Sequence, residues 1–213
     1  LWHTFLTGLG INIAVSGAST TALIHRGLEK VLSETCYPVK IAYGHIIELL
    51  EKGVDYLLFP VIIDLENPHK DTLRSYNCPY IQGFGSMMVS AFGSKKAEKF
   101  ITPTIFMDDI YRNLEDQMVF IGKKLKAPDA LIKSAIGKAK ASQAIFALER
   151  YQKGTQFFKE LHADEKALVI LGKPYNLNDT ALNLNLADKL RKLGIKAIPY
   201  DFIDLDGITL PAH

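Results

Sequence analysis

The sequence predicts an α/β fold: a Rossmann-like parallel sheet domain, a helical connector, and the start of a second α/β domain. Three observations support this prediction. β-rich and amphipathic helical runs alternate over residues 1–109, the β-rich runs are absent over 110–165, and the alternation returns over 166–213. Strands that alternate with helices are typical of a parallel sheet covered by helices on both faces. We therefore expect the first α/β domain at 1–109, the connector at 110–165 and one βαβ unit at 166–213, the chain being a fragment of a longer one.

Three strands are predicted in the first domain. The run "INIAVS" at 11–16 is rich in β-branched residues, and "FITPTIF" at 100–106 has the same character. Between them, "VDYLLFPVII" at 54–63 is apolar almost throughout. A continuous apolar run of this length favours a strand that is buried on both faces.

Helices are predicted between these strands. The run "STTALIHRGLEKVL" begins with Ser19 or Thr20 as a helix N-cap, and 39–52 has apolar residues near helical spacing. Gly53 is expected to end that second helix at the position where glycine is most favoured. A third helix follows the second cysteine and is predicted to run through Phe92.

The remaining chain repeats this alternation after a helical interval. Two or three long helices broken by "KAPDA" are predicted between 110 and 162. A strand at 166–172, a helix at 182–194 and a strand at 195–201 then form the expected βαβ unit.

Composition excludes several classes of function. The formal net charge is only +2, and no basic stripe interleaved with aromatic residues predicts a nucleic-acid partner. The longest apolar run, which begins at Val54, is too short to span a membrane and contains Asp55 and Pro60. Leu1 opens into amphipathic sequence without a basic leader, and two cysteines are too few for a disulfide framework. We therefore expect a cytoplasmic protein with no nucleic-acid or membrane partner.

The two cysteines occupy equivalent places in the sequence. Cys36 stands two residues before Pro38 and Cys78 directly before Pro79, and each proline opens a helical run. A helix N-terminus stabilises thiolate, which is the form of cysteine that binds metals. Both cysteines are expected in loops at the carboxyl ends of neighbouring strands, where ligands gather in open parallel sheets. The alternative is that both are small buried apolar residues, which is common for free cysteine.

Other motifs give weaker indications. The glycines of "GLGINIAVSG" precede the predicted strand instead of following it, so the dinucleotide-binding pattern fails, and no P-loop is present. In "LGKPYNLND", Lys173, Tyr175 and Asn176 are candidates for lining a ligand crevice, whereas Asn178 and Asp179 fit an ordinary capped turn.

Polar residues around the first cysteine are further candidates. Lys40 and His45 lie on the helix that follows Cys36 and are candidates for lining a substrate or cluster site. Solvation and packing on a helix surface explain both residues equally well. Glu34, just before Cys36, is a candidate helix cap.

The segments "SETCYPVKIAYGHIIELLEKGVDYLLFP", "SYNCPYIQGFGSMM" and "ALVILGKPYNLNDTALNLNLADKLRKLGIKAIPYDF" together resemble a known family. They are similar to the uncharacterised domain attached to CoA-substrate-specific enzyme activases. That domain is related to the iron–sulfur subunits of 2-hydroxyacyl-CoA dehydratases and to double-cubane cluster proteins. The resemblance covers nearly the whole chain.

The resemblance implies two Rossmann-like domains that face each other across a helical connection. It implies a [4Fe–4S] or double-cubane cluster in the cleft, with Cys36 and Cys78 as its first two ligands and a further cysteine downstream of residue 213. Because clusters need three or four thiolates, we expect the cluster to be incomplete or absent in these 213 residues, which alone are expected to be inactive.

The implied partner is an ATP-hydrolysing activase, as a domain or a separate protein, with its own iron–sulfur cluster. It supplies low-potential electrons to an acyl-CoA dehydratase or reductase system. The choice between dehydratase, reductase and electron relay stays open, as do contact with an acyl-CoA substrate and a homodimeric assembly. The alternative function is a non-catalytic interaction domain that docks the activase.

Overall fold

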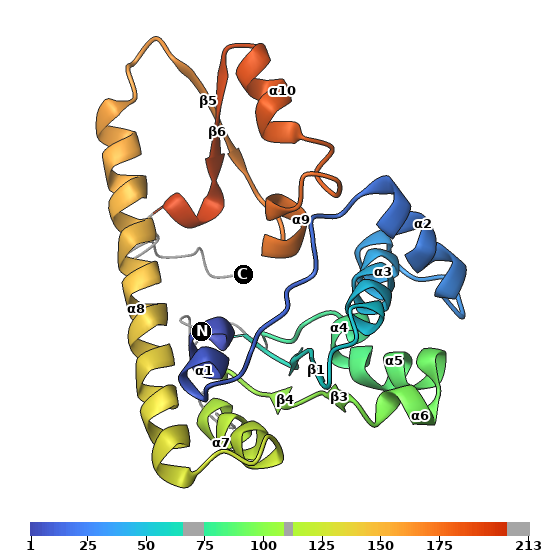
Figure 1. Cartoon of the computed structure of the whole chain (residues 1–213). Coiled ribbons are helices and arrows are strands. Elements are labelled where there is room, and N and C mark those ends of the chain that lie inside the picture. Colours follow the sequence, from blue (N-terminus) through green and yellow to red (C-terminus); the bar gives the residue numbers. More distant parts are fainter. Residues whose placement is uncertain (66–74, 109–112, 204–213) are drawn as a thin grey trace. The chain divides into compact units, whose positions relative to one another are not determined.

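The computed structural model describes residues 1–65, 75–108 and 113–203 (Figure 1). The chain divides into two compact units, Leu1–Lys140 and Ala141–His213. Each unit has its own strands and helices, and each is described by itself below.

Helices make up most of the first unit. Their bounds are α1 (Trp2–Gly8), α2 (Thr21–Lys30), α3 (Tyr37–Glu51), α4 (Pro79–Gln82), α5 (Phe84–Phe92), α6 (Ser94–Ala97), α7 (Leu114–Lys124) and the first part of α8 (Asp129–Glu160). Thr20 is the N-cap of α2, where its side-chain oxygen accepts a hydrogen bond from the Leu23 N–H at 3.2 Å, as the sequence predicts. Gly53 follows α3 with φ +75°, a conformation that favours glycine, so the predicted end of that helix is also confirmed.

Short parallel strand pairs form the sheet of this unit. The strand β1 (Leu57–Leu58) pairs with β3 (Phe100–Ile101), and β2 (Val61–Ile62) pairs with β4 (Thr104–Ile105). The two predicted strands at 54–63 and 100–106 are therefore present, but each is interrupted in the middle. The fold is α/β, as predicted, without the wide sheet of a full Rossmann domain.

A missing backbone donor accounts for the interruption. The N–H groups of residues 57, 59, 61 and 63 donate in turn to the carbonyls of 99, 101, 103 and 105 over 2.9–3.1 Å, so the chains stay parallel throughout. Pro103 has no N–H with which to return a hydrogen bond, and the ladder is therefore one-sided there.

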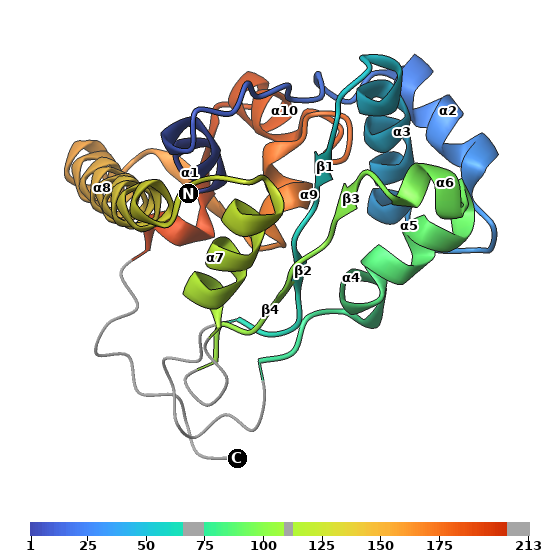
Figure 2. The same ribbon diagram turned by 60° about the horizontal axis from the view of Figure 1, so that its bottom comes forward.

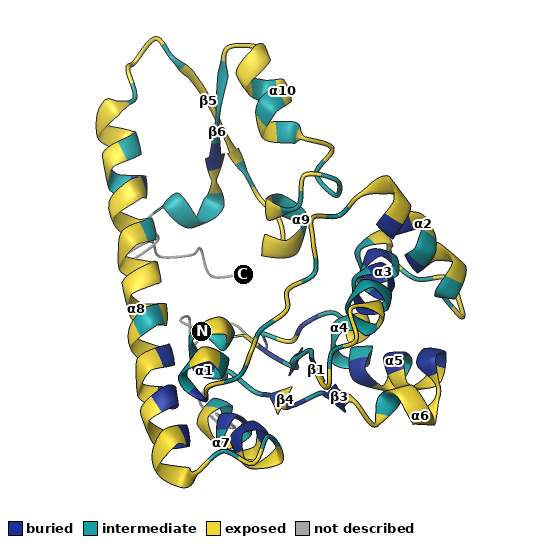
Figure 3. Cartoon of the chain, in the orientation of Figure 1, coloured by how far each residue is buried: buried dark blue, intermediate teal, exposed yellow. Residues whose placement is uncertain are grey.

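Helices cover the strands on both faces. One core cluster brings Leu57 and Phe100 together with residues of α3 and α5, and the other brings Ile101 together with residues of α1, α7 and α8. Figure 2 shows α3 and α5 on one side of the strands and α7 on the other. Because side chains alternate along a strand, neighbouring residues contribute to opposite cores. The buried Ile132, Ala135 and Ala139 of α8 lie in the second cluster. Figure 3 shows dark, buried segments in the part of α8 that lies beside α1 and α7.

Two glycines allow α2 and α3 to pack closely. A Cβ atom at Gly27 would lie 2.3 Å from the Lys40 carbonyl oxygen, and one at Gly44 would lie 2.3 Å from the Leu23 carbonyl oxygen. The two helix backbones are therefore in direct contact. This contact fixes the position of α3, whose first turn follows Cys36.

The buried carboxylate of Asp64 lies at the carboxyl end of the sheet. Asp64, only 2 % exposed, follows β2 and accepts hydrogen bonds from the backbone N–H groups of Met107 at 2.6 Å and Asp108 at 2.9 Å. It also forms an antiparallel bridge with Tyr76. The segment that leads to Cys78 is thereby joined to the end of β2.

The second unit contains the remaining part of α8, the parallel pair β5 (Lys166–Ile170) and β6 (Ile195–Pro199), the helices α9 (Pro174–Asn178) and α10 (Leu186–Lys192), and a 3-10 turn at Tyr200–Phe202. Arg150 of α8 forms an ion pair with Asp201 at 3.0 Å, and Phe157 contacts the ring of Phe202. Both predicted strands are confirmed.

Five local predictions are wrong. Residues 11–16 form an extended segment that pairs with no strand in the described part of the chain. The Val15 carbonyl and the Gly17 N–H contact the side chains of Lys52 and Glu48 instead. The helix after Cys78 is broken at Gly83, and the predicted helix at 182–194 begins only at Leu186, after a series of turns. The other two concern the place of Cys36 and the role of Glu34, and are described with the cysteines.

None of the helices within the described ranges combines the length and apolar content needed to cross a membrane.

Candidate functional site

Cys36 lies at the N-cap of α3. Its carbonyl accepts hydrogen bonds from the N–H groups of Val39 at 3.1 Å and Lys40 at 3.2 Å, and Pro38 occupies the first turn. The thiol is exposed and makes no capping hydrogen bond. The predicted N-cap position is confirmed, and the sulfur is accessible to a ligand.

Cys78 has the same local geometry at the start of α4. Its carbonyl accepts from the N–H groups of Ile81 at 2.9 Å and Gln82 at 3.1 Å, and Pro79 is the first helical residue. The thiol is half-buried and also makes no capping hydrogen bond. Neither cysteine is a fully buried apolar residue, which argues against the alternative interpretation of both as core residues.

Both cysteines were expected at the carboxyl ends of strands, and only Cys78 lies there. Cys78 follows the bridge between Asp64 and Tyr76 and therefore adjoins the carboxyl end of β2. Cys36 instead follows α2 through a loop over residues 31–36, so its predicted place at a strand end is wrong. The reason is that a whole helix, α2, lies between the segment 11–16 and Cys36.

The two cysteine loops nevertheless lie close together. The Tyr80 hydroxyl donates a hydrogen bond to the Glu34 carbonyl at 3.4 Å, which joins a residue two positions after Cys78 to one two positions before Cys36. This contact places the starts of α3 and α4 side by side.

Lys40 and Glu34 form a pair beside the first cysteine. The Lys40 ammonium donates to the Glu34 carboxylate at 2.7 Å, and this hydrogen bond together with the positive charge lowers the pKa of Glu34. Glu34 is therefore an ion-pair partner and not the predicted helix cap, a position that Cys36 occupies. The structure places Lys40 one turn after Cys36 on α3.

A buried hydroxyl adjoins Cys36. The Thr35 Oγ1 atom is shielded from solvent and has no hydrogen-bond partner among the described residues. Buried hydroxyls are nearly always paired in folded proteins. Thr35 is therefore an exception in this loop, next to Cys36 in the sequence.

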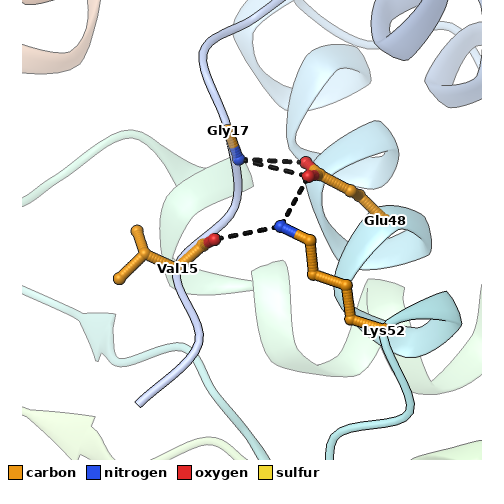
Figure 4. Close-up of polar contacts among 4 residues, drawn as sticks. All are labelled: Val15, Gly17, Glu48 and Lys52. Carbon is orange, nitrogen blue, oxygen red and sulfur yellow. Dashed lines mark hydrogen bonds and ion pairs between the residues drawn. The ribbon is translucent and has the colours of Figure 1, made fainter.

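His45 is engaged on a different part of α3. Its Nε2 atom lies 3.0 Å from the Ser19 hydroxyl. Further along the chain, Glu48 contacts Gly17 and Lys52 contacts Val15 (Figure 4). Sequence reasoning missed Glu48 and Lys52, although their spacing of three and seven residues from His45 places all three on one helix face.

Lys173, Tyr175 and Asn176 belong to the second unit. Lys173 is the N-cap of α9, and its carbonyl accepts from the Asn176 N–H at 2.9 Å. The Tyr175 side chain is exposed. Asp179 accepts from the N–H groups of Ala181 and Leu182, so a capped turn accounts for this end of the motif.

The donor set of this chain does not fit a whole cluster. A [4Fe–4S] cluster takes four thiolates in most proteins, and the sequence contains two cysteines. Within the described ranges, no group of three His, Cys, Asp or Glu side chains is arranged to hold a metal ion. The two thiols can supply two ligands at most.

A comparison with protein families gives one match. Residues 1–203 match the CoA enzyme activase uncharacterised domain (DUF2229). Neither a curated protein nor a solved structure matches the chain.

Proposed function

Because the chain belongs to the family of CoA enzyme activase uncharacterised domains, we propose that it is an electron-transfer module of an activase-linked acyl-CoA dehydratase or reductase system. In this proposal Cys36 and Cys78 supply two thiolate ligands of a [4Fe–4S] or double-cubane cluster, and the remaining ligands come from outside these 213 residues. An ATP-hydrolysing activase with its own cluster is the proposed electron donor.

The observation that carries the proposal is a pair of cysteines at two helix starts, Cys36 exposed and Cys78 half-buried. Cysteine binds iron through its thiolate form. The Tyr80–Glu34 hydrogen bond joins the two loops that carry the cysteines, which supports a ligand shared between them.

Other residues of the chain position the two cysteines. Pro38 and Pro79 fix the first turns of α3 and α4, and the Lys40–Glu34 pair orders the loop before Cys36. The packing of α2 on α3 through Gly27 and Gly44 holds the first cysteine helix in place.

The proposal is tested by iron–sulfur reconstitution of the full-length protein without oxygen. Cys36→Ser and Cys78→Ser are each expected to lower the iron and sulfide content and to weaken or abolish the cluster's electron paramagnetic resonance signal. Ser33→Ala, an exposed residue in the same loop as Cys36, is the matched control and is expected to retain both. Unchanged iron content in both cysteine variants would refute the proposal.

One observation favours a second function. Two thiolates are fewer than a cluster needs, which is consistent with a domain that retains the fold and docks the activase. In that case the full-length protein binds the activase equally well with both cysteines replaced by serine, and carries no iron when purified without oxygen.

A further inference from the structure

An extended segment of the first unit lies outside any sheet. Residues Ile11–Gly17, here named the strap, connect α1 to α2 and have no strand pairing within the described residues. Apolar β-branched residues alternate with smaller or polar ones along the strap, and Val15 is 68 % exposed. Such a sequence favours a strand, and its exposed backbone would gain hydrogen bonds in a sheet.

Side chains of α3 hold the end of the strap (Figure 4). The Glu48 carboxylate accepts from the Gly17 N–H at 3.1 and 3.3 Å, and the Lys52 ammonium donates to the Val15 carbonyl at 3.2 Å. Lys52 also pairs with Glu48 at 2.7 Å, and both side chains are partly exposed, at 43 % and 24 %. These contacts, here named the clamp, are polar and open to solvent, so salt weakens them.

The strand β1 has an open edge. The N–H groups of Leu57 and Phe59 donate toward β3, so that of Leu58 points the opposite way. No described strand pairs with β1 on that side. Pro60 lacks an N–H and limits pairing at that edge to the part of the strand before it.

A cavity separates the strap from this edge. Its volume is about 1000 Å³, and its wall contains residues 11–16 of the strap and residues 54–58 around β1. Trp2 of α1, the single tryptophan of the chain, also lines it.

The strap and β1 run in the same direction. Val15, Gly17 and Ser19 contact Lys52, Glu48 and His45 in turn, so the strap is antiparallel to α3. After α3 the chain reverses at Gly53 and enters β1. Two helices lie between strap and strand, which is the kind of crossover that joins neighbouring parallel strands.

We propose that the strap exchanges between two positions, the clamp on α3 and the open edge of β1. In the second position it forms a third parallel strand and closes the cavity. The clamp competes with this pairing because it occupies the Val15 carbonyl and the Gly17 N–H. The proposal does not depend on iron–sulfur binding, so either can fail without the other.

The test weakens the clamp by mutation and measures hydrogen exchange in both the strap and β1. In the double variant Glu48→Gln, Lys52→Met, hydrogen exchange at the amide of Leu58 and at strap amides is expected to slow about tenfold. Trp2 fluorescence is expected to shift to shorter wavelength, because the closed strap excludes water from the cavity beside its ring.

Glu51→Gln is the matched control. It removes an α3 carboxylate that pairs with Arg26 of α2 and is not part of the clamp. We expect exchange and fluorescence to match the parent protein in this variant. If the double variant does not fold, the same amides are followed in the parent protein between low salt and about 1 M salt, where the clamp is screened. The proposal is overturned if weakening the clamp changes neither measurement. In that case the amides of Leu58 and of the strap exchange at the rate of the parent protein in low salt, and the Trp2 fluorescence is unchanged.

Discussion

Replacing Gly44 by alanine is expected to separate α2 from α3. The added Cβ atom would lie 2.3 Å from the Leu23 carbonyl oxygen and 2.8 Å from its Cδ2 atom, distances that must increase to at least 3.0 Å. The nearest obstacle is backbone, which cannot rotate away as a side chain can. The helices must therefore move apart along their contact.

The expected loss of stability follows from two opposing effects. Overpacking of a tight contact costs about 3 kcal/mol at the upper end of its usual range. Alanine gains about 1 kcal/mol over glycine in a helix. The net destabilisation is about 2 kcal/mol, which corresponds to a fall in melting temperature of about 4–8 °C for a chain of this size.

Chemical denaturation in urea measures this difference, and Gly137→Ala is the control. Gly137 lies on an exposed face of α8, and a Cβ atom added there would meet no other atom within 4 Å. Alanine at this position is therefore expected to stabilise the protein by about 0.5–1 kcal/mol. Equal stability of the Gly44→Ala and Gly137→Ala variants would refute the packing argument.

Two further predictions concern other parts of the chain. Asn77→Ala removes the hydrogen bond from the Asn77 side-chain amide to the Ile62 carbonyl, and is expected to speed alkylation of Cys78 about tenfold while Cys36 in the same molecule keeps its rate. A proportional increase at both cysteines would indicate general unfolding instead. In the second unit, the hydrogen bond from Lys196 lowers the pKa of Glu165 from its usual value of 4.5. The ionised Glu165 carboxylate therefore contributes to stability above pH 4.5, and this contribution is lost as the pH falls through the lowered pKa. Lys196→Met is expected to raise the pKa of Glu165 in an NMR titration and to make melting less dependent on pH in this acid range; an unchanged pKa would contradict the assignment.

Local signals in the sequence predicted much of the fold. The N-cap at Thr20, the helix end at Gly53 and the N-cap positions of both cysteines depend on one or two residues each, and all are confirmed. The interruption of the strand at Pro103 could also have been predicted, because proline has no backbone N–H to donate.

Long-range competition explains what the sequence did not predict. The strap has the composition of a strand, but Glu48 and Lys52 from a helix more than thirty residues away bind its backbone. The Tyr80–Glu34 contact likewise joins residues 46 positions apart, which no local pattern indicates. The shared position of the two cysteines could be predicted, whereas the contact that brings them together could not.

The iron and sulfide content of the full-length protein, purified without oxygen, tests the central claim most directly. If the thiolates of Cys36 and Cys78 share a cluster, the parent protein contains both elements in matching amounts, and each serine variant loses most of them. Iron that persists in both variants, or a parent protein that contains none after reconstitution, would contradict a shared cluster at the two helix starts.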